Sequence, residues 1–168
     1  DIAAFIESAK AAGSCAVYPR WRPPVVEGHV LELGLALADG IALSVAAEQL
    51  PALAALLADP AIAKQAAYSK ELRELLLAHD IKLAGVTDDI ILAAYLLDAM
   101  AGDYQLPQLA AEYGLIPAGD SAVALAALIP NLALEMRARL AEQQMLELYE
   151  KMELPLAAVL ADMERAGV

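Results

Sequence analysis

The first 45 residues alternate short apolar runs with turn residues, a pattern typical of β-strands joined by tight connections. Pro19 should end the first of these strands, and the proline-rich segment 20–28 should form a loop. Asp39-Gly40, between two apolar runs, is a strong signal for a two-residue hairpin turn. The pattern predicts a short helix followed by a β-meander, with the helix at residues 1–12 and the strands at 15–18, 30–38 and 41–45.

After residue 46 the apolar residues recur at helical spacing, with short apolar runs between the helices. Ser69 is a candidate helix cap, and Thr87 or Asp88 is a second one, at the start of a helix that should run to about Met100. The predicted order is helix, strand, helix, strand, helix and helix, at residues 47–59, 62–67, 69–80, around 86, 87–100 and 106–113.

The remaining chain, from Ser121 to its end, reads as helix with breaks near Pro130 and Pro155. Its last helix carries a wide apolar stripe, which should be partly uncovered or fold back on the core, and which we expect to favour self-association. The stripe consists of Leu154, Leu156, Val159, Leu160 and Met163. The predicted order begins with strands and continues with strands that alternate with helices. This order is typical of an α/β domain with a mixed sheet.

Composition narrows the class of protein. Of the 168 residues 60% are hydrophobic but only 5% aromatic, so the apolar mass is mostly Ala and Leu, which favours helix. No uncharged apolar run reaches the roughly 18 residues that a membrane span needs. The single cysteine, Cys15, excludes an internal disulfide and is expected to be a buried, inert thiol. A cytoplasmic location is expected because no signal peptide is recognisable, and the lack of an initiator Met suggests a piece of a longer chain.

The charge balance argues against one class of partner. The chain has 11 Lys and Arg against 23 Asp and Glu, a net charge of −12, and such a domain repels phosphate backbones. Arg20-Trp21-Arg22 is a small basic and aromatic cluster, which we interpret as a surface loop with Trp21 packed on the domain. His29 and His79 lie 50 residues apart without a third ligand and do not predict a metal site.

Two segments carry recognisable motifs. Residues 89–98 read Asp-Ile-Ile-Leu-Ala-Ala-Tyr-Leu-Leu-Asp, followed by Leu-Pro-Gln-Leu-Ala at 106–110, and residues 155–168 contain Pro-Leu-x-x-Val-Leu-x-x-Met-Glu-x-x-Gly-Val. The first segment resembles a helix pair of the 3′–5′ exonuclease domain of family A DNA polymerases, the bacterial DNA polymerase I type. The second resembles the helix that leads into their polymerase domain.

The resemblance spans nearly the whole chain and implies a fold and a domain organisation. The fold should be the ribonuclease-H-like α/β exonuclease fold in shortened form. A vestigial 3′–5′ exonuclease-like domain is expected over residues 1–140. Residues 141–168 should be a helical segment leading into a polymerase domain that is absent from this chain.

An active exonuclease of this family uses four carboxylates to hold two divalent metals, which clamp phosphate oxygens and activate a water. The resemblance places the first motif, Asp-x-Glu, at Val17 and Pro19. The second, an Asn followed four residues later by an Asp, falls at Tyr68 and Leu72, and the third, Tyr-x-x-x-Asp, should lie near Asn131. None of these five positions carries the family's ligand. The resemblance therefore implies a degenerate site with no catalytic residue, no metal and no other cofactor.

Two carboxylates survive near these positions. Glu71 neighbours the second motif, so a one-residue shift would restore a single ligand there, although a solvated helix residue is the simpler interpretation. Asp89 should cap the helix that follows it. One ligand does not make a two-metal site. We expect the former cleft to be filled by apolar groups such as Val17, Pro19, Tyr68 and Leu72.

The function implied by the resemblance is structural. The chain would be the non-catalytic exonuclease-like domain of a bacterial DNA polymerase I, lacking proofreading and bracing the polymerase domain of the parent chain during DNA replication and repair. An active metal-dependent 3′–5′ exonuclease with displaced ligands is the alternative, and a protein- or DNA-binding module is a third class. The net charge disfavours independent nucleic-acid binding, and no membrane partner is expected.

Overall fold

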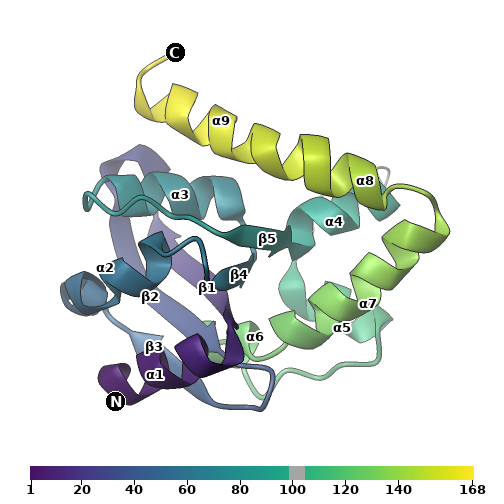
Figure 1. The fold of residues 1–168 in the computed structure, drawn as a ribbon, viewed down its shortest axis with the longest axis horizontal. Helices are drawn as coiled ribbons and strands as arrows, with labels where there is room; N and C mark the ends of the chain where they lie inside the picture. The colour runs from purple at the N-terminus through teal and green to yellow at the C-terminus, as the bar shows by residue number, and fades with distance from the viewer. Residues whose placement is uncertain (99–104) are drawn as a thin grey trace.

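The computed structural model describes residues 1–98 and 105–168 and has a mixed five-stranded sheet at its centre (Figure 1). The strand order is β3-β2-β1-β4-β5, in which β1, β2 and β3 are antiparallel neighbours and β4 and β5 run parallel to β1. The predicted meander and the predicted α/β class are therefore confirmed. The strands are β1 Ser14–Arg22, β2 His29–Ala36, β3 Ala42–Val45, β4 Ala63–Ala66 and β5 Val86–Asp89.

Helices cover both faces of the sheet and enclose two hydrophobic cores. The first core lies under α1 Ile2–Ala12, α2 Leu50–Ala58 and α3 Ser69–Leu77. The second lies under α4 Ile90–Leu97, α5 Leu106–Glu112, α6 Ala122–Ala126 and α7 Ile129–Glu142. Two short 3₁₀ turns, η1 Val25–Glu27 and η2 Ala47–Gln49, join elements of the first layer.

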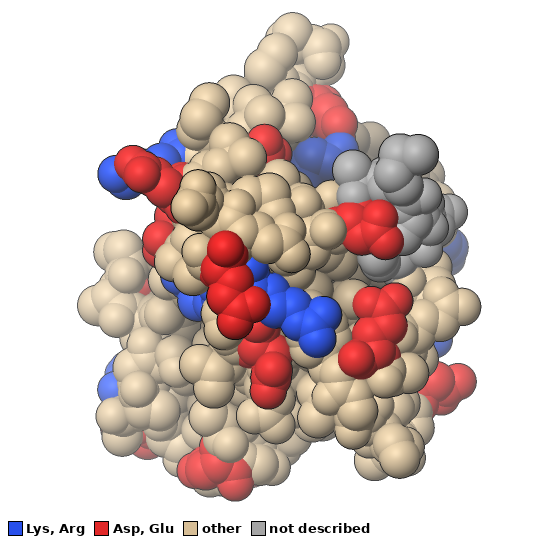
Figure 2. Space-filling model, turned by 90° about the vertical axis from the view of Figure 1, so that its right-hand side faces the viewer, with Lys and Arg blue, Asp and Glu red and all other residues tan. Residues whose placement is uncertain are grey.

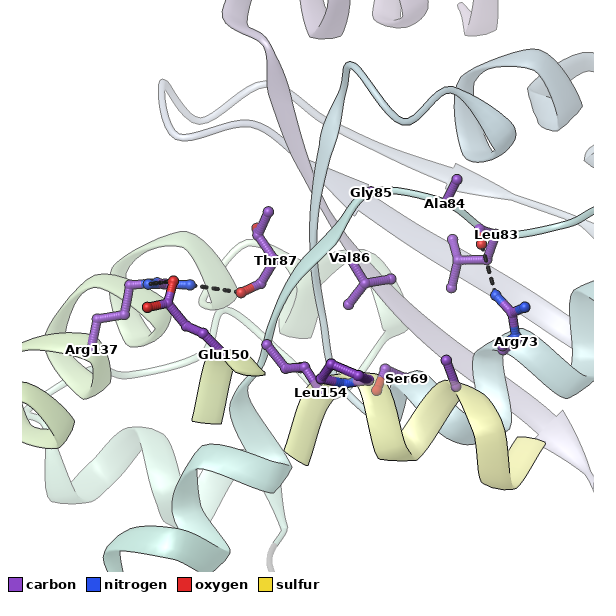
Figure 3. Close-up of a pocket in the computed structure, with 12 residues that line it drawn as sticks. Ser69, Arg73, Leu83, Ala84, Gly85, Val86, Thr87, Arg137, Glu150 and Leu154 are labelled. Carbon is purple, nitrogen blue, oxygen red and sulfur yellow. Dashed lines mark hydrogen bonds and ion pairs between the residues drawn. The ribbon is translucent and has the colours of Figure 1, made fainter. Parts of the chain in front are cut away.

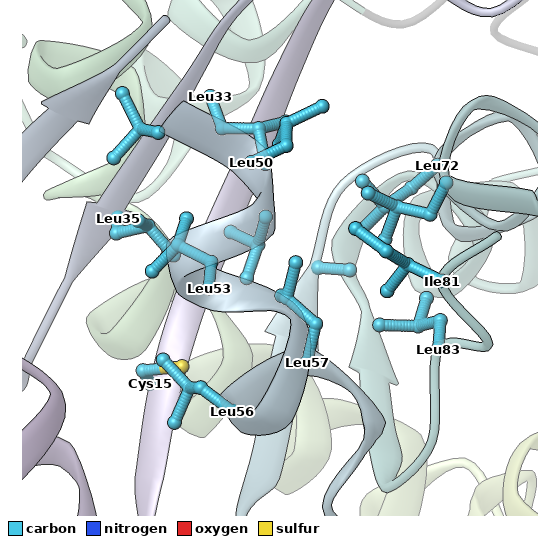
Figure 4. Packing of buried hydrophobic residues seen from close by; sticks show 14 of the residues in the cluster. Cys15, Leu33, Leu35, Leu50, Leu53, Leu56, Leu57, Leu72, Ile81 and Leu83 are labelled. Carbon is cyan, nitrogen blue, oxygen red and sulfur yellow. The ribbon is translucent and has the colours of Figure 1, made fainter. Parts of the chain in front are cut away.

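Leucines of α2 form the centre of the first core. They recur at helical spacing and point onto β1 and β2, where they meet Cys15, Leu33 and Leu35 (Figure 4). Each fully buried Leu stabilises the fold by about 1.5–3 kcal/mol relative to exposure. This apolar stripe, visible in the sequence, fixes α2 against the sheet.

The second layer approaches the sheet most closely at Gly34 of β2. A Cβ atom at this position would lie 2.1 Å from the carbonyl oxygen of Ala122, which begins α6. Only glycine leaves room for the backbone of α6 at this distance. Gly34 therefore sets how near α6 sits to the sheet.

The C-terminal helices run back across the molecule. The chain passes through α8 Leu146–Leu148 and a π-helical turn, η3 Tyr149–Glu153, into α9 Leu154–Arg165, which lies along α3 (Figure 1). Among the residues of α9, all of which the structure describes, only Ala161 is buried. The apolar stripe of this helix is thus folded back and partly uncovered, as expected: Leu156, Val159, Leu160 and Met163 are exposed and Leu154 is half-buried.

The prediction that Pro19 ends the first strand is wrong. β1 continues to Arg22 and pairs with β2 over this length, so residues 20–22 are strand and not loop. The reason lies on the other side of β1, where β4 pairs only as far as Val17. Beyond that point one side of β1 is an open edge, where a strand tolerates proline.

The predicted two-residue hairpin at Asp39-Gly40 is too short. β2 ends at Ala36 and β3 begins at Ala42, and the connection is closed by a 2.8 Å hydrogen bond from the amide of Leu37 to the carbonyl of Ile41. Gly40 has a φ of +98°, so the glycine signal for a turn is sound even though the turn is longer.

In the middle of the chain, the observed helix N-caps lie one or two residues away from the two predicted ones. Tyr68, with a left-handed φ of +57°, precedes α3, and Ser69 is its first residue. Thr87 and Asp88 belong to β5, and Asp89 caps α4, as the separate expectation for this residue stated. The α4 helix ends at Leu97, and Met100 lies outside the described residues.

Near the C-terminus the predicted breaks are partly confirmed. Pro130 and Pro155 each lie in the first turn of a helix, α7 and α9, where proline is tolerated. A further break at Gln144, with a φ of +61°, has no proline or glycine to announce it. Among the described residues, no helix is long and apolar enough to cross a membrane.

Candidate functional site

The first-motif positions lie on β1, facing the first core. Val17 is fully buried in that core, and Pro19 is buried opposite Leu33, a member of the same core. Tyr18, between them, points to the other face and pairs with Gly34. Because alternate residues of a strand face opposite sides, a one-residue shift of the motif would move it from one face to the other.

The shift restores no ligand. The nine residues of β1 read Ser-Cys-Ala-Val-Tyr-Pro-Arg-Trp-Arg and contain no Asp or Glu on either face. A site of the family's type takes two carboxylates from this strand. The absence of carboxylates from β1 therefore does not depend on a one-residue choice of alignment.

The two second-motif positions, Tyr68 and Leu72, lie on opposite faces of the sheet, each at a different hydrophobic core. Leu72 is buried in the first core beside α2, while Tyr68 packs against the second core. The ring of Tyr68 meets Tyr18 and Trp21 edge-on, at centroid distances of 6.1 and 5.6 Å. The backbone of Tyr68 is left-handed, with a φ of +57°, a conformation that Asn adopts more readily than a bulky residue does.

Asn131, the third-motif position, is exposed in the first turn of α7. It belongs to the layer opposite the one that buries Val17 and Leu72. The structure thus buries Val17, Pro19 and Leu72 but does not gather the five positions around one cleft.

The surviving carboxylates share a different hollow. A pocket of about 220 Å³ between α3, α4 and α9 is lined by Tyr68, Glu71 and Asp89, with apolar side chains such as Leu156 and Leu160 from α9. Burial raises the pKa of Glu71 above its ordinary value. This pocket is where a displaced metal site would have to form.

Asp89 is already fully engaged. Its Oδ1 accepts hydrogen bonds from the amides of Ile91 and Leu92 at 3.0 and 3.2 Å, which caps α4. Its Oδ2 accepts from the amide and hydroxyl of Ser69 at 2.8 and 2.5 Å, at the start of α3. Burial raises the pKa of Asp89, while these hydrogen bonds act in the opposite direction. With both oxygens occupied, Asp89 joins two helix N-termini and leaves no lone pair directed at a metal.

The neighbouring Asp88 belongs to a second polar network. Its Oδ1 accepts from Arg137 Nε at 2.8 Å and from the Tyr149 hydroxyl at 3.3 Å. Arg137 also donates to Glu150 and to the carbonyl of Thr87, at 3.0 and 2.7 Å. Burial raises the pKa of Asp88, and Arg137 partly offsets this. The amide of Asp89 donates to the same Tyr149 hydroxyl at 2.7 Å, so this network ties η3 to β5.

A larger pocket of about 470 Å³ lies on the other side of this network, between β5, α3, α7 and α9 (Figure 3). Arg73 and Arg137 line it, but their donors are used: Arg73 binds Asp162 and the carbonyl of Leu83, and Arg137 binds Asp88 and Glu150. Neither of the two arginines in this pocket is therefore unpaired and available to bind an anion.

No group of three or more His, Cys, Asp or Glu in the described part of the chain is arranged to hold a metal ion. The positions that the resemblance assigns to the family's ligands carry Val17, Pro19, Tyr68, Leu72 and Asn131, none of which has a carboxylate.

The other candidate residues have structural partners. Burial raises the pKa of the Cys15 thiol to about 11, as expected for an inert cysteine. His29 pairs with Glu27 at 2.8 Å, and a ring nitrogen of His79 lies 2.9 Å from the carbonyl of Gly28. Trp21 packs on the first core, as predicted, although it lies on β1 and not in a loop.

Charges on the surface are mixed. On the face drawn in Figure 2, the coloured basic side chains lie beside acidic ones and form no continuous basic surface. Arg20, in the only basic cluster noted in the sequence, pairs with Glu32 at 3.7 Å and donates to the carbonyl of Asp120. This arrangement offers little attraction to a phosphate backbone.

The sequence did not single out the buried Tyr149 and Glu74 or the half-buried Arg137. Each lies in a segment whose pattern is an ordinary amphipathic helix. Their environment depends on α8, η3 and α9 folding back over α3 and β5. The apolar stripe of the last helix indicated that it could fold back, but no local signal showed which elements it would meet. Lys70 and Glu74 lie one helical turn apart, and such a pair normally faces solvent. The sequence pattern therefore indicated an exposed Glu74, not a buried one.

Solved structures show the same fold. The chain matches the POL domain of Pol1 from M. smegmatis, in complex with DNA primer-template and dNTP, with a TM-score of 0.88 and 28% identity over 98% of this chain and 30% of that one. Brucella melitensis NrnC with bound Mg²⁺ gives 0.74 and 18% over 94% and 89% of the two chains. Escherichia coli RNase D, an exoribonuclease involved in structured RNA processing, gives 0.77 and 14% over 95% and 48%.

These structures establish the ribonuclease-H-like exonuclease fold, and the chain spans less than a third of the length of the Pol1 chain. No curated protein matches the sequence significantly. The profile of one family, DNA polymerase I, ribonuclease H-like domain, matches residues 29–119, more than half of the chain. The protein belongs to the family of DNA polymerase I ribonuclease-H-like, 3′–5′ exonuclease-like domains.

Proposed function

We propose that this domain is non-catalytic, lacks proofreading and serves as a structural brace for the polymerase domain of a bacterial DNA polymerase I in replication and repair. The observation that carries the proposal is the composition of β1, whose nine residues contain no carboxylate on either face. Two-metal phosphodiester hydrolysis needs carboxylates on this strand to position both metals. Without them the domain has no means of assembling the metal pair, and we expect it to bind neither metal nor another cofactor.

The bracing role is supported by the C-terminal helix. α9 leaves Leu156, Val159, Leu160 and Met163 exposed on one side while its other side lies on α3. An exposed apolar face of this size is typical of a surface that packs against another protein part. We propose that the polymerase domain of the parent chain covers it, and that this helical segment, residues 141–168, marks the passage from one domain to the next.

The charge supports a role without independent DNA binding. The net charge is −12, and the arginines that line the larger pocket are paired with carboxylates. Contacts with DNA would be made by other parts of the parent protein. A cytoplasmic location follows from this role.

The alternative is an active exonuclease with displaced ligands, and one observation favours it. Glu71 and Asp89 line the same 220 Å³ pocket, so two carboxylates face one hollow. Against it, both oxygens of Asp89 are occupied by hydrogen bonds to α3 and α4. Only Glu71 would remain as a ligand.

A nuclease assay distinguishes the two. The 168-residue chain is incubated with 3′-labelled single-stranded DNA and Mg²⁺ or Mn²⁺, beside a mock purification and a Glu71→Ala variant. We expect no shortening above the mock preparation, and no specific heat when Mn²⁺ is titrated in a calorimeter. Metal-dependent shortening that Glu71→Ala removes would overturn the proposal in favour of the displaced-ligand exonuclease.

A further inference from the structure

Glu74 is a fully buried acidic residue on α3, at the surface that α9 covers. Neither of its carboxyl oxygens accepts a hydrogen bond from any residue that the structure describes. Burying an ionised carboxylate without a pairing cation is strongly unfavourable. A buried group in this position reduces that cost by holding a proton.

The charged groups around Glu74 leave it no cation of its own. Lys70 Nζ is 2.6 Å from Glu164 of α9, and Arg73 binds Asp162 of α9 with two bonds of 2.9 and 3.1 Å. Glu74 itself faces Glu164 across the helix interface. The charged groups of the elements packed here are Lys70, Glu71 and Arg73 of α3, Asp162, Glu164 and Arg165 of α9, Lys82 of the loop after α3, and Glu27 of η1, which pairs with His29.

Little apolar contact holds this end of α9. Ala161 is its only buried residue, and the side chains of Asp162 and Glu164 remain about half exposed. The beginning of the segment, in contrast, is anchored by the buried Tyr149 hydroxyl on the Asp89 amide. The distal half of α9, residues 160–165, is therefore held mainly by polar contacts with α3.

We propose that the distal half of α9 is a proton-linked latch: its docking on α3 takes up one proton, held by Glu74 and donated to the Glu164 carboxylate, and losing that proton weakens the docking. Two ionised carboxylates only repel each other, because both are hydrogen-bond acceptors. One proton converts the same contact into a hydrogen bond with an ionised acceptor, the stronger kind. The latch does not depend on the proposed bracing function.

The titration of the pair supports this assignment. Burial and the neighbouring Glu164 raise the pKa of Glu74 from 4.5 to about 7. The hydrogen bond from Lys70 and the contact with Glu74 lower the pKa of Glu164, so the proton resides on Glu74. A group whose pKa is higher in the docked state favours docking at low pH, and this contribution is lost as the pH rises through about 7.

Hydrogen–deuterium exchange of the α9 amides tests the latch in the whole 168-residue chain. After correction for intrinsic exchange rates, we expect protection of the distal half of α9 to fall about tenfold from pH 6 to pH 9. The amides of α7, on the opposite layer, serve as the internal reference. Protection of α9 that is as independent of pH as that of α7 would overturn the proposal.

Substitutions identify the group. Glu74→Gln supplies a permanent N–H donor to Glu164, so α9 should stay protected at pH 9 and its pH dependence should vanish. Glu147→Gln is the matched control, because it removes the same charge from an exposed pair with Lys151 and should keep the native profile. A native pH profile in Glu74→Gln would rule the latch out.

A second variant covers the case in which Glu74→Gln does not fold. Glu164→Gln loses the contact with Lys70, so overall protection of α9 should decrease, but its amide can donate to ionised Glu74. The change between pH 6 and pH 9 should become clearly smaller than tenfold, because Glu164 no longer raises the pKa of Glu74, although burial still does. A persistent tenfold change in this variant would contradict the proposal. The nuclease assay above tests separately whether the domain is non-catalytic, since metal-dependent cleavage would leave the latch result unaffected.

Discussion

Asp89 accepts hydrogen bonds from the first backbone groups of two helices, and in this way one side chain joins α3 to α4. In the sequence it is one more acidic residue in a run that continues from Asp88. Its capping role was predictable, because an Asp before an apolar helical run is a typical N-cap. Its second role, on Ser69 twenty residues earlier, depends on β4 and β5 being neighbours, which local pattern does not show.

Asp89→Ala should therefore cost more than an ordinary cap. We expect a loss of about 3 kcal/mol in the free energy of unfolding, because two caps and a buried hydrogen-bond pair disappear together. Urea denaturation followed by circular dichroism measures it. Ser121→Ala, which removes the single cap of α6, should cost only about 1 kcal/mol. Equal losses in the two variants would show that Asp89 is an ordinary cap.

At the level of elements, most helices and strands were predictable and their connections were not. Apolar residues at helical spacing predicted α2 and α3, and the meander followed from short apolar runs and turn residues. The errors lie where tertiary pairing overrides local preference: β1 continues through Pro19 because its edge is open, and Tyr68 enters a left-handed conformation before α3. The break at Gln144 has no local signal at all.

The candidate site was predictable in its composition and not in its geometry. Inspection of β1 for carboxylates needs only the sequence. The separation of Val17 and Leu72 from Tyr68 and Asn131 needs the face that each residue takes in the sheet and its layers. That assignment depends on strand register, and a one-residue change in register moves a side chain to the opposite face.

The contact between α6 and β2 gives a prediction at this scale. Gly34→Ala places a methyl group 2.1 Å from a backbone oxygen of α6, and backbone cannot move aside as a flexible side chain can. We expect a loss of about 2–3 kcal/mol.

The control for this substitution is Gly119→Ala, at a glycine with nothing within 4 Å and no left-handed φ. Its stability should change by less than about 0.5 kcal/mol. Thermal or urea unfolding measures both variants. If Gly34→Ala were as stable as Gly119→Ala, α6 would not be held as close to the sheet as described.

For the whole molecule, the direction of the carboxyl pKa shifts determines how stability depends on pH. Glu71, Glu74, Asp88 and Asp89 all have a raised pKa, mainly because they are buried, and their protonated forms therefore favour the folded state. Stability from such groups is present at low pH and is lost as the pH rises through their folded-state pKa. Asp162 and Glu164 have a lowered pKa and act in the opposite sense, but only at more acidic pH.

The protein should accordingly be more stable at pH 5 than at pH 9. From Glu74 alone, with a pKa of about 7, we expect a difference of about 2–3 kcal/mol in the free energy of unfolding. Urea denaturation at the two pH values measures it. In Glu74→Gln the difference should shrink by most of this amount, whereas in Glu147→Gln it should not. Maximal stability at pH 8 or above would contradict the assignment of the buried carboxyl.

Cys15 lies on the central strand, between β2 and β4, and is the only cysteine of the chain. Its burial both excludes reagents and raises its pKa to about 11, so the reactive thiolate is scarce in the folded state. Alkylation at neutral pH must therefore wait until the middle of the sheet opens. The rate at which iodoacetamide modifies the native protein would report how often the sheet opens, without denaturant, dye or engineered label.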